Sequence, residues 1–449
     1  MNSKKWLPDS WKNKTVLQQP CYENSLELKN VVTEIKSLPP IVFEGEVDSL
    51  KQKLSLAEKG KMFILQGGDC VERFEDCNET TIINKIKILL QMSLILTYAT
   101  KIPVLKIGRI AGEYSKPRTS EYEVIDGMKM LSYKGDSINS FLPIPEERIA
   151  KPSRIKDSYF HAAATYNYIR AITKGGFADL HQPSQWDIDF VEQTSNLNEY
   201  KNLTKSVLDA VSFVESFGVN SEIFNCIDFY ISHEGLLLPY EESMTRMSKS
   251  GNTYYNLGTH MPWIGERTRN IKNAHVEYFR GIENPIGVKI SSKIEPEELI
   301  RLIDTVNPSN ESGKICLITR MGCKNVKQYL PSLIKAIKKS NKKVTWICDP
   351  MHGNTIVTKQ NLKTRRFDDI LTELIHTFEV HKEMESFMAG VHFELTGDHV
   401  TECIGGASQI KEEGLGENYQ TFCDPRLNYN QSLEISFLIT KLLTQVSYP

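Results

Sequence analysis

Short apolar runs that end in polar or charged side chains recur along the chain. Residues 344–348 form a β-branched and aromatic run whose one polar member is Thr345, the pattern of a strand buried on both faces. An Asp-Pro pair beginning at Asp349 ends the run, and His352 and Asn354 follow in a turn. A buried strand that delivers an imidazole to its carboxyl end is a common way to position a metal ligand or a catalytic base.

The same pattern appears at other places in the sequence. The eight predicted strands occupy residues 62–65, 104–105, 227–231, 254–255, 286–290, 315–318, 344–348 and 391–395. Most are followed by charged side chains, and longer amphipathic segments separate them. Eight such strands predict an α/β fold, a (β/α)8 barrel with its functional groups at the carboxyl ends of the strands.

Two long segments fall outside this repeat. Residues 1–55 are predicted to form an N-terminal extension that packs on the barrel or on a partner subunit. The catalytic barrel is predicted to span 56–449, with an insert after the second strand at about 110–225. The insert could form a lid, an oligomer contact or an effector site.

Composition narrows the class of protein. The formal net charge of −2 gives no reason to expect nucleic acid or membrane as a partner. Nine scattered cysteines without a Cys-x-x-Cys pair argue against a disulfide framework and favour a reducing compartment. The N-terminus lacks an apolar core of signal-peptide length, and residues 82–97, the most apolar stretch, are judged too polar to span a bilayer. We therefore expect a cytoplasmic protein.

Four potential metal ligands follow predicted strands or lie in a later turn: Cys70, His352, Glu394 and Asp424. A set of thiolate, imidazole and carboxylate ligands suits a borderline divalent ion such as Mn²⁺, Co²⁺, Zn²⁺ or Fe²⁺, with positions left open for a substrate. Each residue also has a structural alternative. Cys70 could be a small buried residue and His352 a turn residue. Glu394 could pair with an arginine, and Asp424 could cap a helix.

Six cations lie at or after predicted strand ends: Arg109, Lys116, Arg118, Arg267, Lys289 and Arg320. Fixed cations in one barrel mouth repel one another unless an anion lies between them. The expected ligands are phosphorylated or carboxylated small molecules, bound by bidentate hydrogen bonds from the arginines. The alternative is that the cations pair with nearby acids, namely Glu113, Glu234, Glu266 and Asp349.

Together these residues lie in blocks that resemble the type II, or plant-like, 3-deoxy-D-arabino-heptulosonate 7-phosphate (DAHP) synthases. The matching blocks are residues 11–12, 18–20, 66–74, 108–112, 116–118, 232–236, 260–269, 284–289, 320–322, 348–354, 394–397, 401–406 and 423–428. The resemblance implies a transferase that condenses phosphoenolpyruvate with erythrose 4-phosphate to give DAHP and phosphate. This reaction is the first step of the shikimate pathway to chorismate and the aromatic amino acids.

The resemblance also implies roles for single residues. The metal ligands of the family match Cys70, His352, Glu394 and Asp424, for one divalent ion, with Mn²⁺ favoured. The phosphoenolpyruvate site matches Arg109, Glu266, Arg267, Lys289 and Arg320, and the sugar phosphate site matches Lys116, Arg118 and Thr119. Glu266, or Lys116 through a water, is the candidate for positioning the attacking water and moving its proton.

The chain departs from the family pattern at three positions. Thr119 stands where the family usually has Ser, Glu113 where Gln is usual, and Lys134 where Arg is usual. Thr119 keeps the hydroxyl, whereas Glu113 adds negative charge near a phosphate site. Cys423 adjoins Asp424 and is predicted to approach Cys70 and form a disulfide on oxidation.

Two other functions stay open from the sequence. One is a secondary-metabolism paralogue that uses an imino sugar phosphate, and the other is a weakly active regulatory partner of chorismate mutase. The complete set of ligands and cations argues against the second, because a retired site is expected to lose costly buried charges. The resemblance implies an oligomer, a homodimer or a homotetramer.

Overall fold

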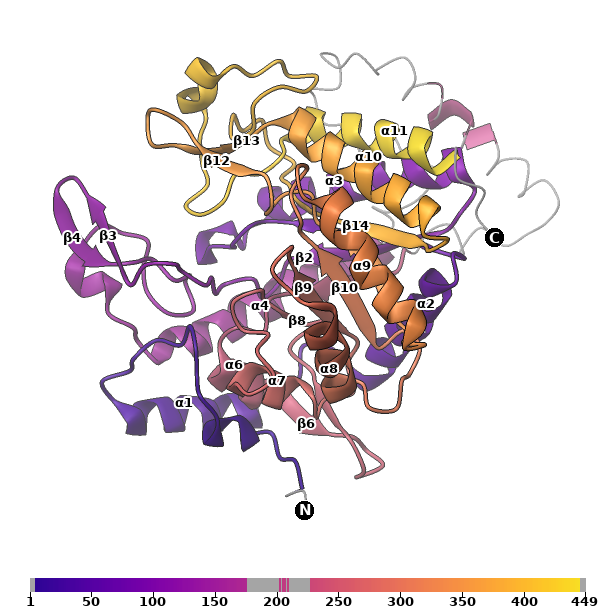
Figure 1. The fold of residues 1–449 in the computed structure, drawn as a ribbon. Helices are drawn as coiled ribbons and strands as arrows, with labels where there is room; N and C mark the ends of the chain where they lie inside the picture. Colours follow the sequence, from indigo (N-terminus) through magenta and orange to yellow (C-terminus); the bar gives the residue numbers. More distant parts are fainter. Residues whose placement is uncertain (1–4, 176–201, 203, 207, 210–226, 445–449) are drawn as a thin grey trace.

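Eight parallel strands form the centre of the molecule (Figure 1). The computed structural model describes residues 5–175, 202, 204–206, 208–209 and 227–444. The strands are β1 (Phe63–Gly68), β2 (Val104–Arg109), β5 (Phe229–Ser232), β8 (Trp263–Ile264), β9 (Ile286–Ile290), β10 (Ile315–Thr319), β11 (Thr345–Cys348) and β14 (Met388–Glu394). Their order in the sheet is β5-β2-β1-β14-β11-β10-β9-β8.

A short bridge joins the two end strands of this sheet. Glu234, just beyond β5, forms a parallel bridge with Trp263 of β8. The backbone N–H of Trp263 donates to the carbonyl of His233, and the N–H of Gly235 donates back to Trp263, both at 3.0 Å. The sheet therefore closes on itself, and the predicted (β/α)8 barrel is confirmed.

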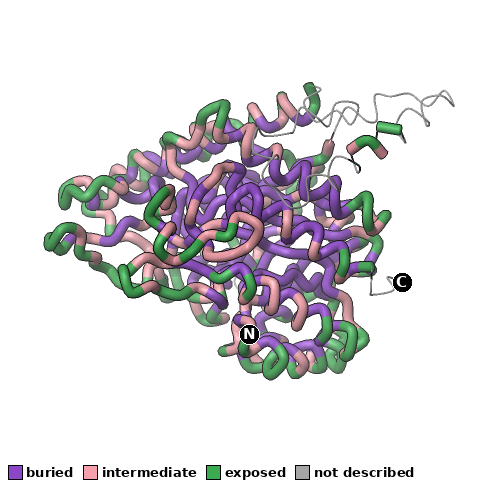
Figure 2. The backbone as a smooth tube through the Cα atoms, turned by 90° about the horizontal axis from the view of Figure 1, so that it is seen from above, coloured by how far each residue is buried: buried purple, intermediate pink, exposed green. Residues whose placement is uncertain are grey.

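Helices surround the barrel. They are α3 (Glu79–Thr100), α4 (Ser153–Lys174), α6 (Leu238–Met244), α7 (Ala274–Phe279), α8 (Pro296–Val306), α9 (Val326–Lys339), α10 (Phe367–Glu383) and α11 (Tyr429–Thr444). The apolar faces of α8 and α9 pack with β9 and β10 in one buried cluster that includes Leu302, Leu330 and Ile334. Figure 2 shows the buried residues gathered in the centre, with exposed residues on the outer turns.

Helix α3 corrects one expectation from the sequence. Asn78 caps its N-terminus, where the side chain accepts from the backbone N–H of Thr81 at 3.0 Å. By length and composition α3 could cross a membrane, so the view that its polar residues exclude a span was wrong. Its place in the fold is decided by packing instead: 67% of its most apolar window is buried, and it lies against α11.

Inward-facing side chains change character along the barrel axis. Helix α2 (Glu44–Glu58) closes the amino-terminal end, where Leu50 and Leu54 share a buried cluster with Leu105 and Ile107 of β2. The next residue on the same face of β2 is Arg109, because strand side chains alternate with a period of two. The barrel is thus apolar at the end closed by α2 and charged at its carboxyl end.

The predicted fourth strand, at 254–255, is wrong. That segment is β7 (Tyr254–Asn256), which pairs antiparallel with β6 (Thr245–Met247) in a hairpin outside the barrel. The barrel strand in this position is β8, only two residues long, and it pairs with β9. The predicted run at 254–255 is as short as β8, and at this length the apolar pattern does not distinguish a barrel strand from a hairpin strand.

The extension and the insert pack on the barrel at several places. The extension contains η1 (Ser10–Asn13) and α1 (Ser25–Ser37), and α1 lies against α4 and α6. The described part of the insert contains the hairpin β3 (Tyr122–Ile125) and β4 (Met128–Leu131), then η3 (Pro145–Arg148) and α4. Residues 176–201 and 210–226 of the insert lie outside the described residues. The division of the chain at residue 55 falls inside α2 and stays a prediction.

Candidate active site

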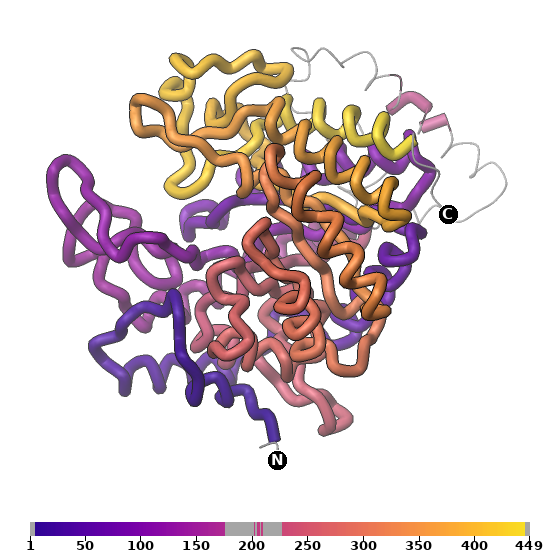
Figure 3. The backbone as a smooth tube through the Cα atoms, in the orientation of Figure 1, coloured from indigo at the N-terminus to yellow at the C-terminus, as the bar shows by residue number. Residues whose placement is uncertain are grey.

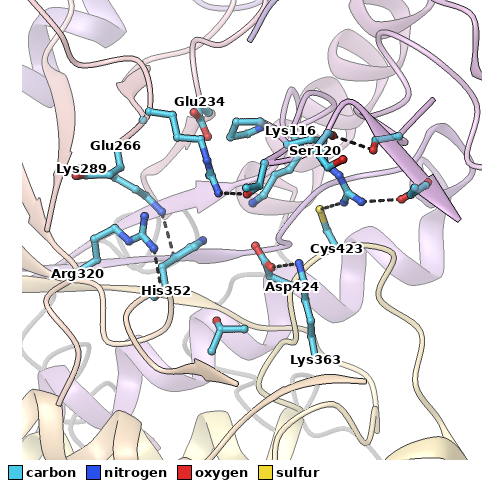
Figure 4. Close-up of a pocket in the computed structure, with 18 of the residues that line it drawn as sticks. Lys116, Ser120, Glu234, Glu266, Lys289, Arg320, His352, Lys363, Cys423 and Asp424 are labelled. Carbon is cyan, nitrogen blue, oxygen red and sulfur yellow. Dashed lines mark hydrogen bonds and ion pairs between the residues drawn. The ribbon is translucent and has the colours of Figure 1, made fainter. Parts of the chain in front are cut away.

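A cavity of about 430 Å³ opens at the carboxyl ends of the barrel strands (Figure 4). It is lined by Lys116, Pro117, Arg118, Thr119, Ser120, Tyr122, Glu123, Ser132, Glu234, Gly265, Glu266, Arg267, Lys289, Arg320, His352, Thr355, Lys363, Cys423 and Asp424. Most of the residues predicted for the site are in this set. Three are not: Arg109, Cys70 and Glu394 are at most 1% exposed and belong to the buried barrel top.

Three of the four predicted metal ligands converge. The Sγ of Cys70 and carboxylate oxygens of Glu394 and Asp424 all lie within 4.8 Å of one another. Cys70 follows β1 and Glu394 ends β14, and these neighbouring strands pair in register at Gly68 and Glu394, so their ends meet. The backbone N–H of Asp424 donates to Cys70 Sγ at 3.2 Å, which holds the later turn against the strand ends.

The fourth predicted ligand, His352, reaches the same place from β11. Its Nε2 lies 2.9 Å from Glu394 Oε1, and its Nδ1 lies 2.8 Å from Asp349 Oδ2. Asp349 also contacts Lys289 Nζ at 3.0 Å. Burial alone would raise the pKa of Asp349, but His352 and Lys289 outweigh it and hold that pKa well below its usual range. The ionised Asp349 therefore fixes the imidazole with Nε2 turned toward Glu394.

Glu394 is surrounded by cations. Its Oε1 lies 3.2 Å from Arg109 Nη2 and 3.4 Å from Lys116 Nζ, and Arg365 Nη2 lies 2.8 Å from Oε2. Burial would raise the pKa of Glu394, but His352 and the three cations hold it well below its usual range. The carboxylate is therefore ionised, as a metal ligand must be.

Cys70 behaves differently. Burial, together with its hydrogen bond to Cys423 and the charge of Glu394, raises the pKa of Cys70 well above its usual value. A thiolate at this position therefore requires an additional cation close by. Cys70, Glu394 and Asp424 lie together, and His352 contacts Glu394. A thiolate, an imidazole and two carboxylates fit a borderline divalent ion by donor chemistry, so these four residues are the ones that could hold it.

Arg109 is not a free cation of the mouth. It is fully buried, with Nη1 2.7 Å from His392 Nε2 and Nη2 donating to the carbonyl of Cys70 at 3.1 Å. It also lies 3.6 Å from Glu113. Two of the cations therefore pair with nearby acids, Arg109 with Glu113 and Lys289 with Asp349. The predicted contact of Arg109 with phosphoenolpyruvate stays a prediction.

Glu266, another acid that could have paired with the cations, does not neutralise them. Glu266 Oε1 accepts from Ser291 Oγ at 2.7 Å and from Arg269 Nη2 at 3.2 Å, so it pairs with neither Arg267 nor Lys289. Its second oxygen makes no hydrogen bond to any residue that the structure describes. Arg267 Nη2 donates instead to the hydroxyl of Thr119 at 2.9 Å. The cavity therefore keeps an excess of cations on its wall.

The remaining cations have partial partners. Arg118 Nη2 donates to Glu123 Oε2 at 2.7 Å, Lys116 Nζ donates to the carbonyl of Cys70 at 2.9 Å, and Arg320 Nη2 donates to the carbonyl of His352 at 2.9 Å. Figure 4 shows Lys289, Arg320 and His352 on one side of the cavity and Cys423, Asp424 and Lys363 on another. An anion between these groups would contact several donors at once.

Two functional candidates were missed from the sequence. Lys363 lines the cavity and contacts Asp424 Oδ1 at 3.0 Å, and Arg365 lies fully buried against Glu394. Both come from β13 (Lys363–Arg365), which pairs with β12 (Thr355–Val357) in a hairpin beside the C-terminal loops (Figure 3). The two cations do not follow a barrel strand, because this hairpin lies in the connection after β11. The one available signal was the Lys-Thr-Arg spacing, which puts both cations on one face of an extended segment.

Comparison with known proteins shows the family of the chain. Residues 6–440 match the model of the class-II DAHP synthetase family. The chain is 43% identical over 434 residues to phospho-2-dehydro-3-deoxyheptonate aldolase of Streptomyces coelicolor, covering 97% of this chain and 96% of the relative. It is 43% identical over 455 residues to the enzyme of that name from Neurospora crassa, covering 98% and 94%, respectively. Identity to the AroG aldolase of Mycolicibacterium smegmatis is 40% over 440 residues, covering 97% and 94%. The chain belongs to the class-II DAHP synthetase family.

Proposed function

We propose that this protein is a DAHP synthase that condenses phosphoenolpyruvate with erythrose 4-phosphate, releasing phosphate. The observation that carries the proposal is a cation-lined cavity directly above a cluster of thiolate, imidazole and carboxylate side chains. Two phosphorylated substrates need the cations, and C–C bond formation at an aldehyde needs a group that accepts developing negative charge on oxygen.

The cations orient the two substrates. Lys289, Arg320 and Arg267 would bind the phosphate and carboxylate of phosphoenolpyruvate, with Arg109 supporting them from below. Lys116, Arg118 and Thr119 would hold the sugar phosphate, where the hydroxyl of Thr119 already contacts Arg267. Holding the enol carbon and the aldehyde in reacting geometry removes much of the entropic cost of a bimolecular step.

A divalent ion held by Cys70, His352, Glu394 and Asp424, with Mn²⁺ favoured, would supply Lewis-acid polarisation of the aldehyde oxygen. Glu266 would then position the water that attacks C2 of the former enol and take its proton. The second oxygen of Glu266 supports this role, since it has no hydrogen-bond partner among the described residues. Lys116, acting through a water, is the alternative proton carrier.

The test is phosphoenolpyruvate consumption and phosphate release in the presence of erythrose 4-phosphate. The proposal is supported if one phosphate is released for each phosphoenolpyruvate consumed and DAHP is the product. Replacing Arg320 by alanine should raise KM for phosphoenolpyruvate by about 10- to 100-fold, the effect of removing a charged hydrogen-bond donor. Lys335→Ala, which changes an exposed lysine on α9, should leave KM unchanged. Turnover only with an imino sugar phosphate would favour the secondary-metabolism function.

The assembly and location of the enzyme are also proposals. We infer a cytoplasmic homodimer or homotetramer. Light scattering of the purified protein tests the oligomer. A chorismate mutase partner would appear as a larger complex and as a change in turnover when that enzyme is added.

A further inference from the structure

One buried carboxylate joins two turns at the edge of the cavity. Glu373, on α10, is fully buried. Its Oε1 accepts the backbone N–H groups of Met321 at 2.8 Å and Gly322 at 2.9 Å, and its Oε2 accepts from Asn354 Nδ2 at 2.7 Å. No residue predicted for the site contacts Glu373 directly.

The two turns carry different parts of the site. The turn after β10 presents Arg320, and the turn after β11 presents His352. They are joined by Arg320 Nη2, which donates to the carbonyl of His352 at 2.9 Å, and by the N–H of Cys323, which donates to Asn354 Oδ1 at 2.9 Å. Each turn therefore depends on the position of the other.

The turns also touch through their backbones. A Cβ atom at Gly353 would lie only 2.3 Å from the backbone nitrogen of Gly322, so any side chain at this point would force the turns apart. Gly322 itself has φ +86°, a conformation that favours glycine. Glu373 lies behind this contact and receives a hydrogen bond from each turn.

Stability alone does not explain a carboxylate at this position. Burial raises the pKa of Glu373, and no lysine or arginine pairs with it within the described part of the chain, but the hydrogen bonds from Gly322, Met321 and Asn354 lower that pKa and favour the ionised carboxylate. An unpaired buried carboxylate costs free energy. In return it presents acceptors on both oxygens, which three converging donors require and which an amide cannot supply.

We propose that Glu373 is a positioning residue that fixes Arg320 and His352 relative to each other, so that the anion-binding arginine and the imidazole ligand face the cavity together. This inference rests on the proposed function for the roles of those two residues. The bonding pattern itself does not depend on that function.

The hydrogen-bond pattern suggests a reciprocal test. In Glu373→Gln the amide oxygen can still accept from Met321 and Gly322, but the amide nitrogen faces the donor group of Asn354. If Asn354 rotates to offer its oxygen, the bond from Cys323 is lost. The double variant Glu373→Gln with Asn354→Asp exchanges donor and acceptor between the two side chains. The new carboxylate at position 354 can accept from both the amide at position 373 and the N–H of Cys323, but it cannot replace the bond that Asn354 Nδ2 donates to the carbonyl of Pro350 at 2.8 Å. The double variant therefore restores the link between the two turns and leaves the turn after β11 with one bond fewer.

Hydrogen exchange tests whether Glu373 couples the two turns, and KM for phosphoenolpyruvate tests whether that coupling affects substrate binding. Hydrogen exchange of the segments 319–326 and 349–355 should accelerate together in Glu373→Gln. In the double variant, exchange of 319–326 should return toward the wild-type rate, whereas 349–355 should stay faster because the bond to the carbonyl of Pro350 is lost. KM for phosphoenolpyruvate should rise about tenfold in the single variant, as for one buried group left without its hydrogen bond. The matched control is Glu379→Gln, the same change at an exposed position on α10.

The positioning role is overturned if Glu373→Gln changes exchange in neither turn, or if exchange of 319–326 is as fast in the double variant as in the single one. It is also overturned if Glu379→Gln has an equal effect on exchange and KM. If wild-type protein consumes no phosphoenolpyruvate, the proposed function fails, yet the exchange measurement still decides whether Glu373 couples the two turns.

Discussion

His352 lies between two carboxylates, with Nε2 2.9 Å from Glu394 and Nδ1 2.8 Å from Asp349. The two contacts are not equivalent, because Glu394 is itself a predicted ligand, whereas Asp349 contacts the nitrogen that points away from the cluster. An imidazole that donates from one nitrogen to a carboxylate presents its other nitrogen to a metal in a fixed orientation. Asp349 is therefore expected to tune metal binding without touching the ion.

Replacing Asp349 by asparagine should weaken metal binding by about 10- to 100-fold, because the amide holds the imidazole less firmly and leaves Lys289 without its ion pair. Titration of metal-stripped protein with Mn²⁺ in a calorimeter measures the change. Asp368→Asn, at an exposed position on α10, is the control. Equal affinities of Asp349→Asn and wild type would show that Asp349 has no such role.

Glu113 should give the enzyme a pH dependence near neutrality. Burial raises its pKa to about 7, and its Oε1 lies 3.6 Å from Arg109 Nη2. As pH rises through this value, Glu113 gains a negative charge next to the anion site. KM for phosphoenolpyruvate should therefore rise between pH 6 and 8 by about three- to tenfold more in wild type than in Glu113→Gln. Titration of the substrate is common to both proteins, so parallel profiles would refute the effect.

Cys423 is predicted to make the metal site sensitive to oxidation. Its thiol shares a buried cluster with Cys70, and the hydrogen bond between the two thiols lowers the pKa of Cys423 to about 7. Peroxide would oxidise one thiol to a sulfenic acid, from which the other thiol displaces water to form a disulfide. Wild-type protein should then lose metal and recover it after treatment with dithiothreitol, whereas Cys423→Ser should keep its metal. Metal loss that persists in Cys423→Ser would exclude this disulfide.

Lys314 should make the free energy of unfolding depend on pH above neutrality. It is 5% exposed at the amino-terminal end of β10, its Nζ donates to the carbonyl of Ile282 at 2.5 Å, and burial lowers its pKa to about 7. Unfolded lysine titrates at about 10.4, so between these values the unfolded chain binds a proton that the folded chain lacks. The free energy of unfolding therefore rises with pH across this window.

The corresponding variant is Lys314→Met, which removes the titrating group. The increase in Tm between pH 7 and pH 9.5 should be smaller in this variant than in wild type or in Lys335→Met, which changes an exposed lysine. Scanning calorimetry at both pH values provides the measurement. If the three proteins show the same increase, Lys314 is protonated in the folded state.

The sequence predicted the barrel because seven of its strands are apolar runs with charged residues near their carboxyl ends. Arg109 and Glu394 are typical, since each ends a strand and the period of two then turns it inward. The strand β8 was missed because the short runs Tyr254-Tyr255 and Trp263-Ile264 carry too little pattern to tell a barrel strand from a hairpin strand.

The site was predictable where its residues follow strands and less so elsewhere. Lys363 and Arg365 reach Asp424 and Glu394 from a hairpin, and only the tertiary structure brings that hairpin to the barrel mouth. Arg109 was expected to face substrate, but its burial against His392 depends on side-chain packing that a sequence pattern does not contain. The contacts of Glu373 link two turns through a third element and have no sequence signature at all.

The proposed reaction depends on a metal ion held by Cys70 below the cavity in which the substrates would condense. The most direct measurement is phosphoenolpyruvate consumption by metal-stripped protein offered erythrose 4-phosphate, with and without Mn²⁺ or Co²⁺, in wild type and in Cys70→Ser. We expect turnover that requires added metal in wild type and is lost in Cys70→Ser. Undiminished turnover of stripped wild type or of the folded Cys70→Ser protein without metal would contradict the claim.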